Sequence, residues 1–223
     1  MLNLSAAKIL LTSAGFETEA IKTAFLGFLD KPVINAKVLF IPTAANNAGA
    51  IAFLPKCMND LLKVGFLAEN IHVFDLHRSL SLEEISIYDA IYFTGGSPPY
   101  LMERINKTGF NIPLNEFVCR GGIYVGVSAG SYVAADNLPD SLGYLKAKLN
   151  VHAENGSDVG VFDNETVTHI DLTDCVKITA ETGALTLGSM QLHNTHKYQK
   201  KGVWIVGLLL IQLKQIFDTF MLV

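Results

Sequence analysis

Five short, almost wholly apolar segments alternate with helical stretches in the first part of the chain. The apolar segments are KILLTS, KVLFIPT, IHVFDL, AIYFTGG and GIYVGVS, at residues 8–13, 37–43, 71–76, 90–96 and 122–128. Strands that are nearly continuous in apolar residues are typical of a parallel sheet covered on both faces. Helical spacing is found between and around them, at residues 17–30, 47–66, 98–109 and 111–122. The alternation predicts an α/β fold, a doubly wound, mostly parallel sheet sandwiched by helices in a flavodoxin-like three-layer arrangement.

Size, charge and cysteine usage narrow the class of protein. With 223 residues, half of them apolar, the chain can bury a substantial core, and we predict one domain over residues 1–223. The formal net charge is −4 and no basic run stands out, which argues against nucleic acid and membranes as partners. Three scattered cysteines without a CxxC spacing, and an N-terminus without a basic leader, predict a cytoplasmic protein.

The pattern changes after residue 135, where Asp, Asn and Gly become frequent. This part reads as loops with one strand, expected at AKLNVHA, residues 147–153. Residues 202–223 hold an apolar stretch before Lys214 that is well short of the roughly 20 residues needed to span a bilayer. We expect a docked helix there, or a strand and a short helix. A homodimer formed through residues 203–213 is a further hypothesis.

In a sheet of this kind, ligands bind at the carboxyl ends of the strands. Small and polar residues occupy these ends in this chain: Ser13, Thr43, Gly95, Gly96 and Ser128. Each of these residues is common in loops and indicates little on its own. Their common location at successive strand ends is the stronger evidence for a site. We therefore predict the functional site at this edge of the sheet. The side chains expected to contact substrate are Ser13, Thr43 and Ser97.

The stretch GVSAG, residues 126–130, has the spacing G-x-S-x-G between an apolar strand and a helical stretch. This arrangement is typical of a nucleophile elbow, in which a serine on a sharp turn projects above the sheet. Gly126 and Gly130 would let the backbone turn tightly around Ser128. The simpler alternative is that Ser128 is only a small residue in a glycine-rich turn between a strand and a helix.

A serine nucleophile also needs hydrogen-bond donors for the oxyanion that develops on the substrate. The amide of Ala129 follows the serine and opens the next helix, whose positive dipole end would favour negative charge. A second donor is expected from the neighbouring turn TGGSPPYL, where Gly95 and Gly96 have no side chain to block a backbone N–H.

A base must accept the serine proton, and the chain has six histidines. In the chain order of α/β-hydrolase catalytic residues the base follows the nucleophile, which disfavours His72 and His77. His152 in LNVHAEN leaves room for a helix, a loop and a returning strand after Ser128, and it is the best candidate. His169 lies in an alternating pattern that is more typical of a solvated strand residue.

No metal or organic cofactor is expected. His193 and His196 have a spacing of i, i+3 that suits a metal only on a helix, and nothing near them in the sequence completes a site.

With these pieces placed, the sequence resembles the peptidase E family of serine peptidases, whose fold is like the class I glutamine amidotransferase domain. Four blocks carry the resemblance over roughly residues 8–155: LLTSAGF, VLFIPTAA, IYFTGGSPPYLMERI and GGIYVGVSAGSYVA. It implies hydrolysis of a short peptide or isopeptide by a serine acyl-enzyme mechanism, in the manner of a dipeptidase or exopeptidase. Ser128 falls on the family's nucleophile, and His152 falls where the family places its base.

The chain also departs from the family. The segment between Ser128 and His152 is short and offers two acidic residues, Asp136 and Asp140, either of which could orient the histidine. The Arg-containing stretch that follows the family's histidine has no counterpart here, so aspartate specificity is not predicted. The tail from about residue 185 is unlike the family. A catalytically silent amidotransferase-like binding module, and an esterase or amidase acting on a small non-peptide acyl substrate, are the alternative functions.

Overall fold

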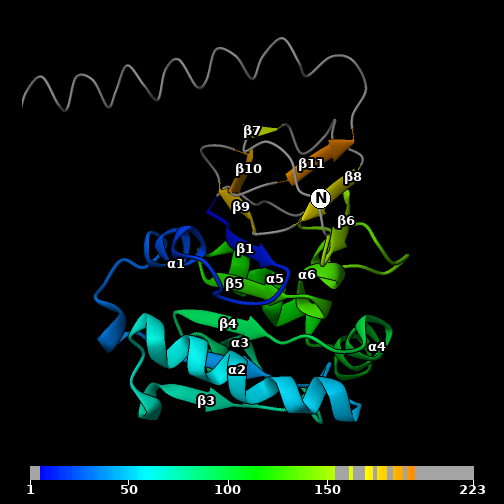
Figure 1. The fold of residues 1–223 in the computed structure, drawn as a ribbon. Helices are drawn as coiled ribbons and strands as arrows, with labels where there is room; N and C mark the ends of the chain where they lie inside the picture. The colour runs from blue at the N-terminus through cyan, green and yellow to red at the C-terminus, as the bar shows by residue number, and fades with distance from the viewer. Residues whose placement is uncertain are drawn as a thin grey trace, which may run out of the picture.

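The computed structural model describes residues 6–153, 161–162, 169–172, 175–179, 183–187 and 190–193. Its main sheet contains the five predicted strands: β1 (Lys8–Thr12), β2 (Val38–Ile41), β3 (Ile71–Val73), β4 (Ala90–Phe93) and β5 (Ile123–Val127). They pair in parallel in the order β3-β2-β4-β5-β1, as Figure 1 shows. The mostly parallel α/β sheet predicted from the sequence is therefore confirmed.

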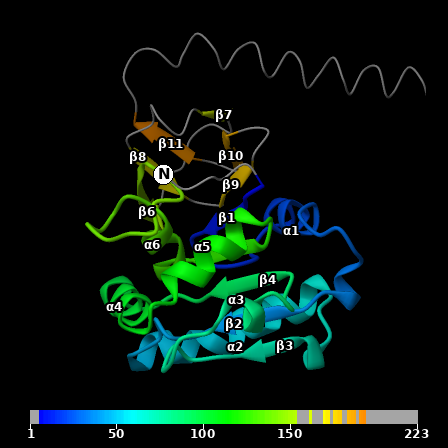
Figure 2. The same cartoon turned by 180° about the vertical axis from the view of Figure 1, so that it is seen from behind.

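Helices cover both faces of this sheet (Figures 1 and 2). One face carries α1 (Glu19–Leu26) and α2 (Ala48–Val64). The other carries α3 (Leu82–Ile85), α4 (Pro98–Thr108), α5 (Asn111–Cys119) and α6 (Ala129–Ala134). Two short 3-10 helices, Val33–Asn35 and Ala68–Asn70, precede β2 and β3. The helix α4 has Ser97 as its N-cap and proline in its first turn.

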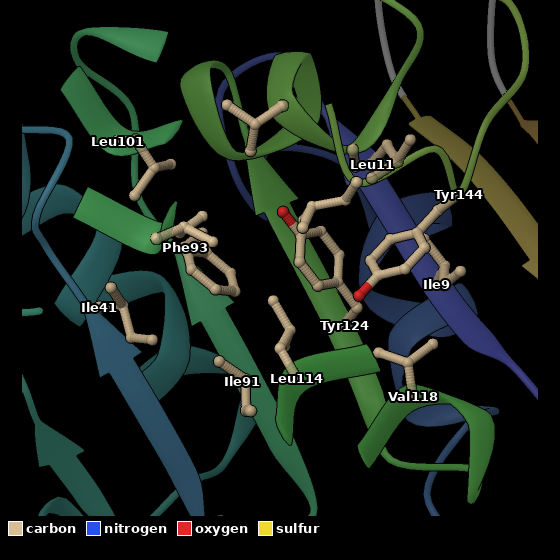
Figure 3. Packing of buried hydrophobic residues seen from close by; sticks show 14 of the residues in the cluster. Ile9, Leu11, Ile41, Ile91, Phe93, Leu101, Leu114, Val118, Tyr124 and Tyr144 are labelled. Carbon is tan, nitrogen blue, oxygen red and sulfur yellow. The ribbon is translucent and has the colours of Figure 1, made fainter. Parts of the chain in front are cut away.

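Alternate residues of each strand enter two separate apolar cores, because successive side chains point to opposite faces of a sheet. On one face, Tyr92 packs with residues of α1 and α2. On the other, the rings of Phe93 and Tyr124 stack with centroids 5.0 Å apart, and Tyr144 meets Tyr124 edge-on at 5.3 Å, as Figure 3 shows. The hydroxyl of Tyr124 donates to the carbonyl oxygen of Gly130 at 2.6 Å, which ties this core to α6.

Antiparallel strands extend the structure beyond β1. The strand β9 (Cys175–Thr179) pairs with β1, and β10 (Gly183–Leu187) and β7 (Val161–Phe162) follow it outward. A second sheet consists of β6 (Lys148–Val151), β8 (His169–Leu172) and β11 (Met190–His193). The predicted strand at 147–153 is therefore present as β6, and residues 136–147 form the expected loops, with one isolated bridge at Leu145. The alternating pattern around His169 corresponds to β8, whereas the sequence does not predict β7, β9, β10 and β11. These strands are short, and they are ordered by long-range pairing, β9 with β1 and β8 with β6.

The apolar segment 202–223 and His196 lie outside the described residues. Within the described ranges, no helix is both long and apolar enough to cross a membrane.

Candidate active site

Ser128 occupies the turn between β5 and α6 in an uncommon backbone conformation. Its φ and ψ are 48° and −100°, and a non-glycine residue at such a positive φ costs on the order of 1–3 kcal/mol. Its amide donates to the carbonyl oxygen of Thr12 on the neighbouring strand at 2.9 Å, and its own carbonyl accepts from the amide of Tyr132 at 2.8 Å. The strained turn is therefore held by β1 on one side and by the first turn of α6 on the other.

Two glycines make this turn sterically feasible. A Cβ atom on Gly126 would lie 2.7 Å from the carbonyl carbon and oxygen of Gly130. A Cβ atom on Gly130 would lie 2.7 Å from the Cβ atom of Phe93 on β4. Real Cβ atoms essentially never make such short contacts, so both positions require glycine. The spacing G-x-S-x-G thus reflects close packing of α6 against β4 and β5.

Ser131 supports the turn from below, and the sequence interpretation did not single it out. Its hydroxyl is fully buried and accepts from the amide of Thr12 at 2.9 Å. The same oxygen lies within donating distance of the carbonyl oxygens of Thr12 and Gly126, at 2.7 and 2.8 Å. The only signal in the sequence is a polar residue on the buried side of the short helix that follows Ser128.

His152 reaches Ser128 from the second sheet. It follows β6, and its Nε2 atom lies 2.8 Å from Ser128 Oγ. When the hydroxyl donates to Nε2, the imidazole is neutral and carries its proton on Nδ1. The backbone of His152 also has a positive φ, of 61°, in a region where histidine is more common than most non-glycine residues. Its amide donates to Ser13 Oγ at 3.1 Å.

Two glycines form the start of the β4–α4 turn, and Gly95 lies next to Ser128. A Cβ atom on Gly95 would lie 3.2 Å from Ser128 Cβ and 3.7 Å from its Oγ, so the absent side chain leaves the hydroxyl open. Gly96 has a φ of 142°, and its missing side chain would overlap the carbonyl oxygen of Ala44. Within the described residues, no backbone hydrogen bond takes the amide of Gly95 or Gly96. The amide of Ala129 begins α6, where the first N–H groups have no partner inside the helix.

The three hydroxyls predicted to contact substrate are engaged within the protein. Ser13 Oγ donates to the carbonyl oxygen of Leu172 at 2.7 Å while accepting from the amide of His152. Thr43 Oγ1 donates to Asp75 at 2.6 Å and accepts from the amide of Leu76 at 2.9 Å. Ser97 accepts from the amide of Tyr100 as the N-cap of α4. These side chains frame the site, and their contact with substrate stays a prediction.

The two acidic candidates for a third site residue lie on the connection between α6 and β6. Asp140 is exposed and accepts a hydrogen bond from the side-chain amide of Asn106 on α4. Asp136 is exposed as well, and its backbone amide donates to the carbonyl oxygen of Ala147 at 3.1 Å. Between the described residues, no hydrogen bond joins either carboxylate to His152. In the same part of the chain, no three His, Cys, Asp or Glu residues are grouped so that they could hold a metal ion.

Comparison with known proteins gives a consistent family. The sequence profile of Peptidase family S51 matches residues 9–171, most of the chain. A protein of Listeria monocytogenes serovar 1/2a named "Uncharacterized peptidase Lmo0363" is 24% identical over 156 residues, which cover 70% of this chain and 76% of that protein. "Uncharacterized peptidase Lin0382" of Listeria innocua serovar 6a is 26% identical over 160 residues, with 70% and 75% covered.

A crystal structure of a candidate peptidase E protein from Listeria monocytogenes EGD-e has a similar fold. Its TM-score is 0.52 at 23% identity, with 64% of this chain and 77% of that chain covered. At this identity the likeness concerns the fold. By its sequence match over residues 9–171, this chain belongs to peptidase family S51, the peptidase E family.

Proposed function

We propose that this protein is a serine-type peptidase that cleaves a short peptide or isopeptide bond, with Ser128 as nucleophile and His152 as general base. The observation that carries the proposal is the separation of 2.8 Å between Ser128 Oγ and His152 Nε2, at a serine whose φ of 48° is that of a sharp strand-to-helix turn. A nucleophile and a base within hydrogen-bond reach are the minimal requirement for nucleophilic catalysis. The turn is then a nucleophile elbow.

In the first half of the proposed reaction, Ser128 Oγ attacks the carbonyl carbon while its proton passes to His152 Nε2. The C–N bond breaks as His152 gives this proton to the leaving amine, and the acyl group stays on Ser128. In the second half, water gives a proton to His152 and attacks the acyl carbon. The bond between the acyl carbon and Ser128 Oγ then breaks as His152 returns the proton to Oγ, and the acid is released.

Backbone amides would stabilise the negative charge that develops on the substrate oxygen. In this proposal the donors are the N–H groups of Ala129, at the start of α6, and of Gly96 in the β4–α4 turn, with Gly95 as a further donor. Donors of this kind act in a preorganised site and cost no reorganisation during the reaction.

The third catalytic residue in this proposal is Asp136 or Asp140, acting on Nδ1 of His152. A carboxylate at that atom would hold the imidazole in the tautomer whose Nε2 accepts the serine proton. Because both residues belong to the connection that leads into β6, either is placed on the same segment of chain as His152.

The decisive experiment is reaction of the purified protein with a fluorophosphonate probe, followed by intact-mass analysis. Ser128 Oγ would form a bond to phosphorus as the P–F bond breaks, with fluoride leaving and the serine proton accepted by His152. We expect one adduct in the wild type and none in Ser128→Ala. A positive result leads to a screen of dipeptides with neutral and Asp N-terminal residues side by side, together with simple esters and amides. A folded wild-type protein that forms no adduct would instead indicate a silent binding module.

A further inference from the structure

The carboxyl end of β1 contacts both members of the proposed catalytic pair. Thr12, the last residue of β1, accepts the amide of Ser128 at 2.9 Å. Ser13, the next residue, accepts the amide of His152 at 3.1 Å through its side-chain oxygen. Two consecutive residues therefore fix the backbones of two residues that come from different sheets.

The Ser13 hydroxyl joins three segments of the chain. It donates to the carbonyl oxygen of Leu172, the last residue of β8, at 2.7 Å. The same carbonyl accepts the amide of Ala153 at 3.3 Å. Since β6 and β8 are paired in parallel with Val151 opposite Leu172, the hydroxyl of Ser13 connects the end of the second sheet to the end of the main sheet. Ser13 as a whole is 4% exposed, so water does not compete freely for these bonds.

The turn that carries Ser13 is itself anchored from α2. Lys56 Nζ donates to the carbonyl oxygen of Ala14 at 2.6 Å, and Asp60 accepts from the amide of Phe16 at 3.3 Å. Lys56 and Asp60 form an ion pair at 3.0 Å. Although burial acts to lower the pKa of Lys56, Asp60 and Glu17 outweigh it and raise that pKa, so the lysine stays charged. These contacts fix the position of Ser13, whose hydroxyl in turn binds the amide of His152.

His152 needs this anchor because its backbone conformation is strained. A non-glycine residue at φ 61° persists only where the surrounding contacts over-determine it. The imidazole is exposed, so packing around the ring does little to set its direction. The backbone anchors at residues 152 and 153 are then the contacts that aim Nε2 at Ser128 Oγ.

We propose that Ser13 is a positioning residue, which sets the distance between Ser128 and His152 by binding the amide of His152 and the carbonyl of Leu172 with one hydroxyl. The inference rests on the proposed function, since it assigns Ser13 a task in activating Ser128. It replaces the substrate contact predicted for this side chain. A displacement of about 1 Å in such a pair can lower a rate by as much as about 100-fold.

The test measures phosphonylation of Ser128 over a range of fluorophosphonate concentrations, which separates the maximal rate from the half-saturating concentration. In Ser13→Ala we expect the maximal rate to fall by about 10-fold to 100-fold, with the half-saturating concentration changed less than about twofold because the probe does not contact Ser13. The pH–rate profile of His152→Ala should lack the limb that the wild type owes to this base. The same limb should be less pronounced in Ser13→Ala. Ser13→Thr, which keeps the hydroxyl, should restore most of the maximal rate.

Ser141→Ala is the matched control. Its hydroxyl accepts from the amide of Leu138 at 2.9 Å, in the connection between α6 and β6, and among the described residues no hydrogen bond joins it to His152. This variant should react as the wild type does. Should Ser13→Ala fail to fold, Ser13→Cys supplies a weaker donor and acceptor at the same place and is expected to give an intermediate maximal rate.

The outcomes separate the two proposals. A wild-type protein that does not react overturns the serine peptidase and this inference with it. A reactive wild type with an unchanged maximal rate in folded Ser13→Ala or Ser13→Cys overturns the inference alone. An increased half-saturating concentration with an unchanged maximal rate would overturn the positioning role and indicate that Ser13 contacts the substrate.

Discussion

The carbonyl oxygen of Thr12 accepts the amide of Ser128 at 2.9 Å, so the turn between β5 and α6 is held from the neighbouring strand β1. The two strands are in register up to this point, with Thr12 opposite Val127. The hydroxyl of Ser131 binds the amide of Thr12 as well. A main-chain hydrogen bond, a strand register and one buried hydroxyl together maintain the positive φ of Ser128.

Removing either member of the proposed catalytic pair should abolish most of the activity. We expect Ser128→Ala and His152→Ala each to lower kcat for a dipeptide identified in the screen by about a thousandfold or more. The double variant should be no worse than either single one, because the two groups act as a unit. Steady-state kinetics on the three variants measures this, and additive losses would contradict a shared catalytic step.

The carboxylate that orients His152 is identified by asparagine variants, which keep the shape but remove the charge. We expect one of Asp136→Asn and Asp140→Asn to lower the maximal phosphonylation rate by about 100-fold or more, since a misplaced proton on the imidazole disables the base. The other should remain within about twofold of the wild type. Rates preserved in both variants would exclude the two residues together.

A methyl group at residue 95 should crowd the nucleophile without unfolding the protein. The added Cβ atom in Gly95→Ala would lie 3.7 Å from Ser128 Oγ and 3.2 Å from its Cβ, where the attacked carbon must approach. We expect the phosphonylation rate to fall by about tenfold or more, and further in Gly95→Val. Gly49→Ala is the control, because its new methyl group makes an ordinary contact of 3.5 Å with Asn47 at the start of α2. Equal rates in Gly95→Val and the wild type would show that the substrate does not approach past residue 95.

Ser131→Ala should destabilise the fold. The variant leaves the amide of Thr12 without its buried acceptor, and an unpaired buried polar group costs about 1–3 kcal/mol. Urea unfolding should therefore give a free energy of unfolding lower by about that amount. Ser86→Ala removes an exposed hydroxyl bonded to the carbonyl of Leu82 and should change the value by less than about 0.5 kcal/mol. Equal effects in both variants would contradict a special role for Ser131.

Three buried tyrosines should resist ionisation until the protein unfolds. Burial raises the pKa of Tyr92, Tyr124 and Tyr144 above the ordinary value, which is about 10. Above that pH the unfolded chain loses phenolic protons that the folded chain retains, so the free energy of unfolding falls as the pH rises. Phenolate absorbance and circular dichroism, followed together in an alkaline titration, should show these three groups ionising only as the secondary structure is lost. Full ionisation of every tyrosine in a chain with native circular dichroism would contradict this.

The sequence by itself determined the central sheet, the two layers of helices and the sharp turn at Ser128. Local patterns predict these features: apolar runs indicate strands covered on both faces, helical spacing indicates the helices between them, and glycines flanking a serine indicate the turn. The strand β1 is a clear example, since every residue from Ile9 to Thr12 is buried. Local sequence is sufficient to predict burial in such a strand, because the position of each residue within the strand decides its surroundings.

Only the tertiary structure decided how the site is assembled. The bonds that join Ser13 to His152 and to Leu172 link residues 139 and 159 positions apart, and serine, histidine and a main-chain carbonyl carry no periodic signal that would reveal them. The same reason explains the strand β9, which takes its place in the main sheet by pairing with β1, a strand far from it in the sequence. Hydrophobic burial thus dictates the scaffold from the sequence, whereas hydrogen bonds between distant segments dictate the geometry around Ser128.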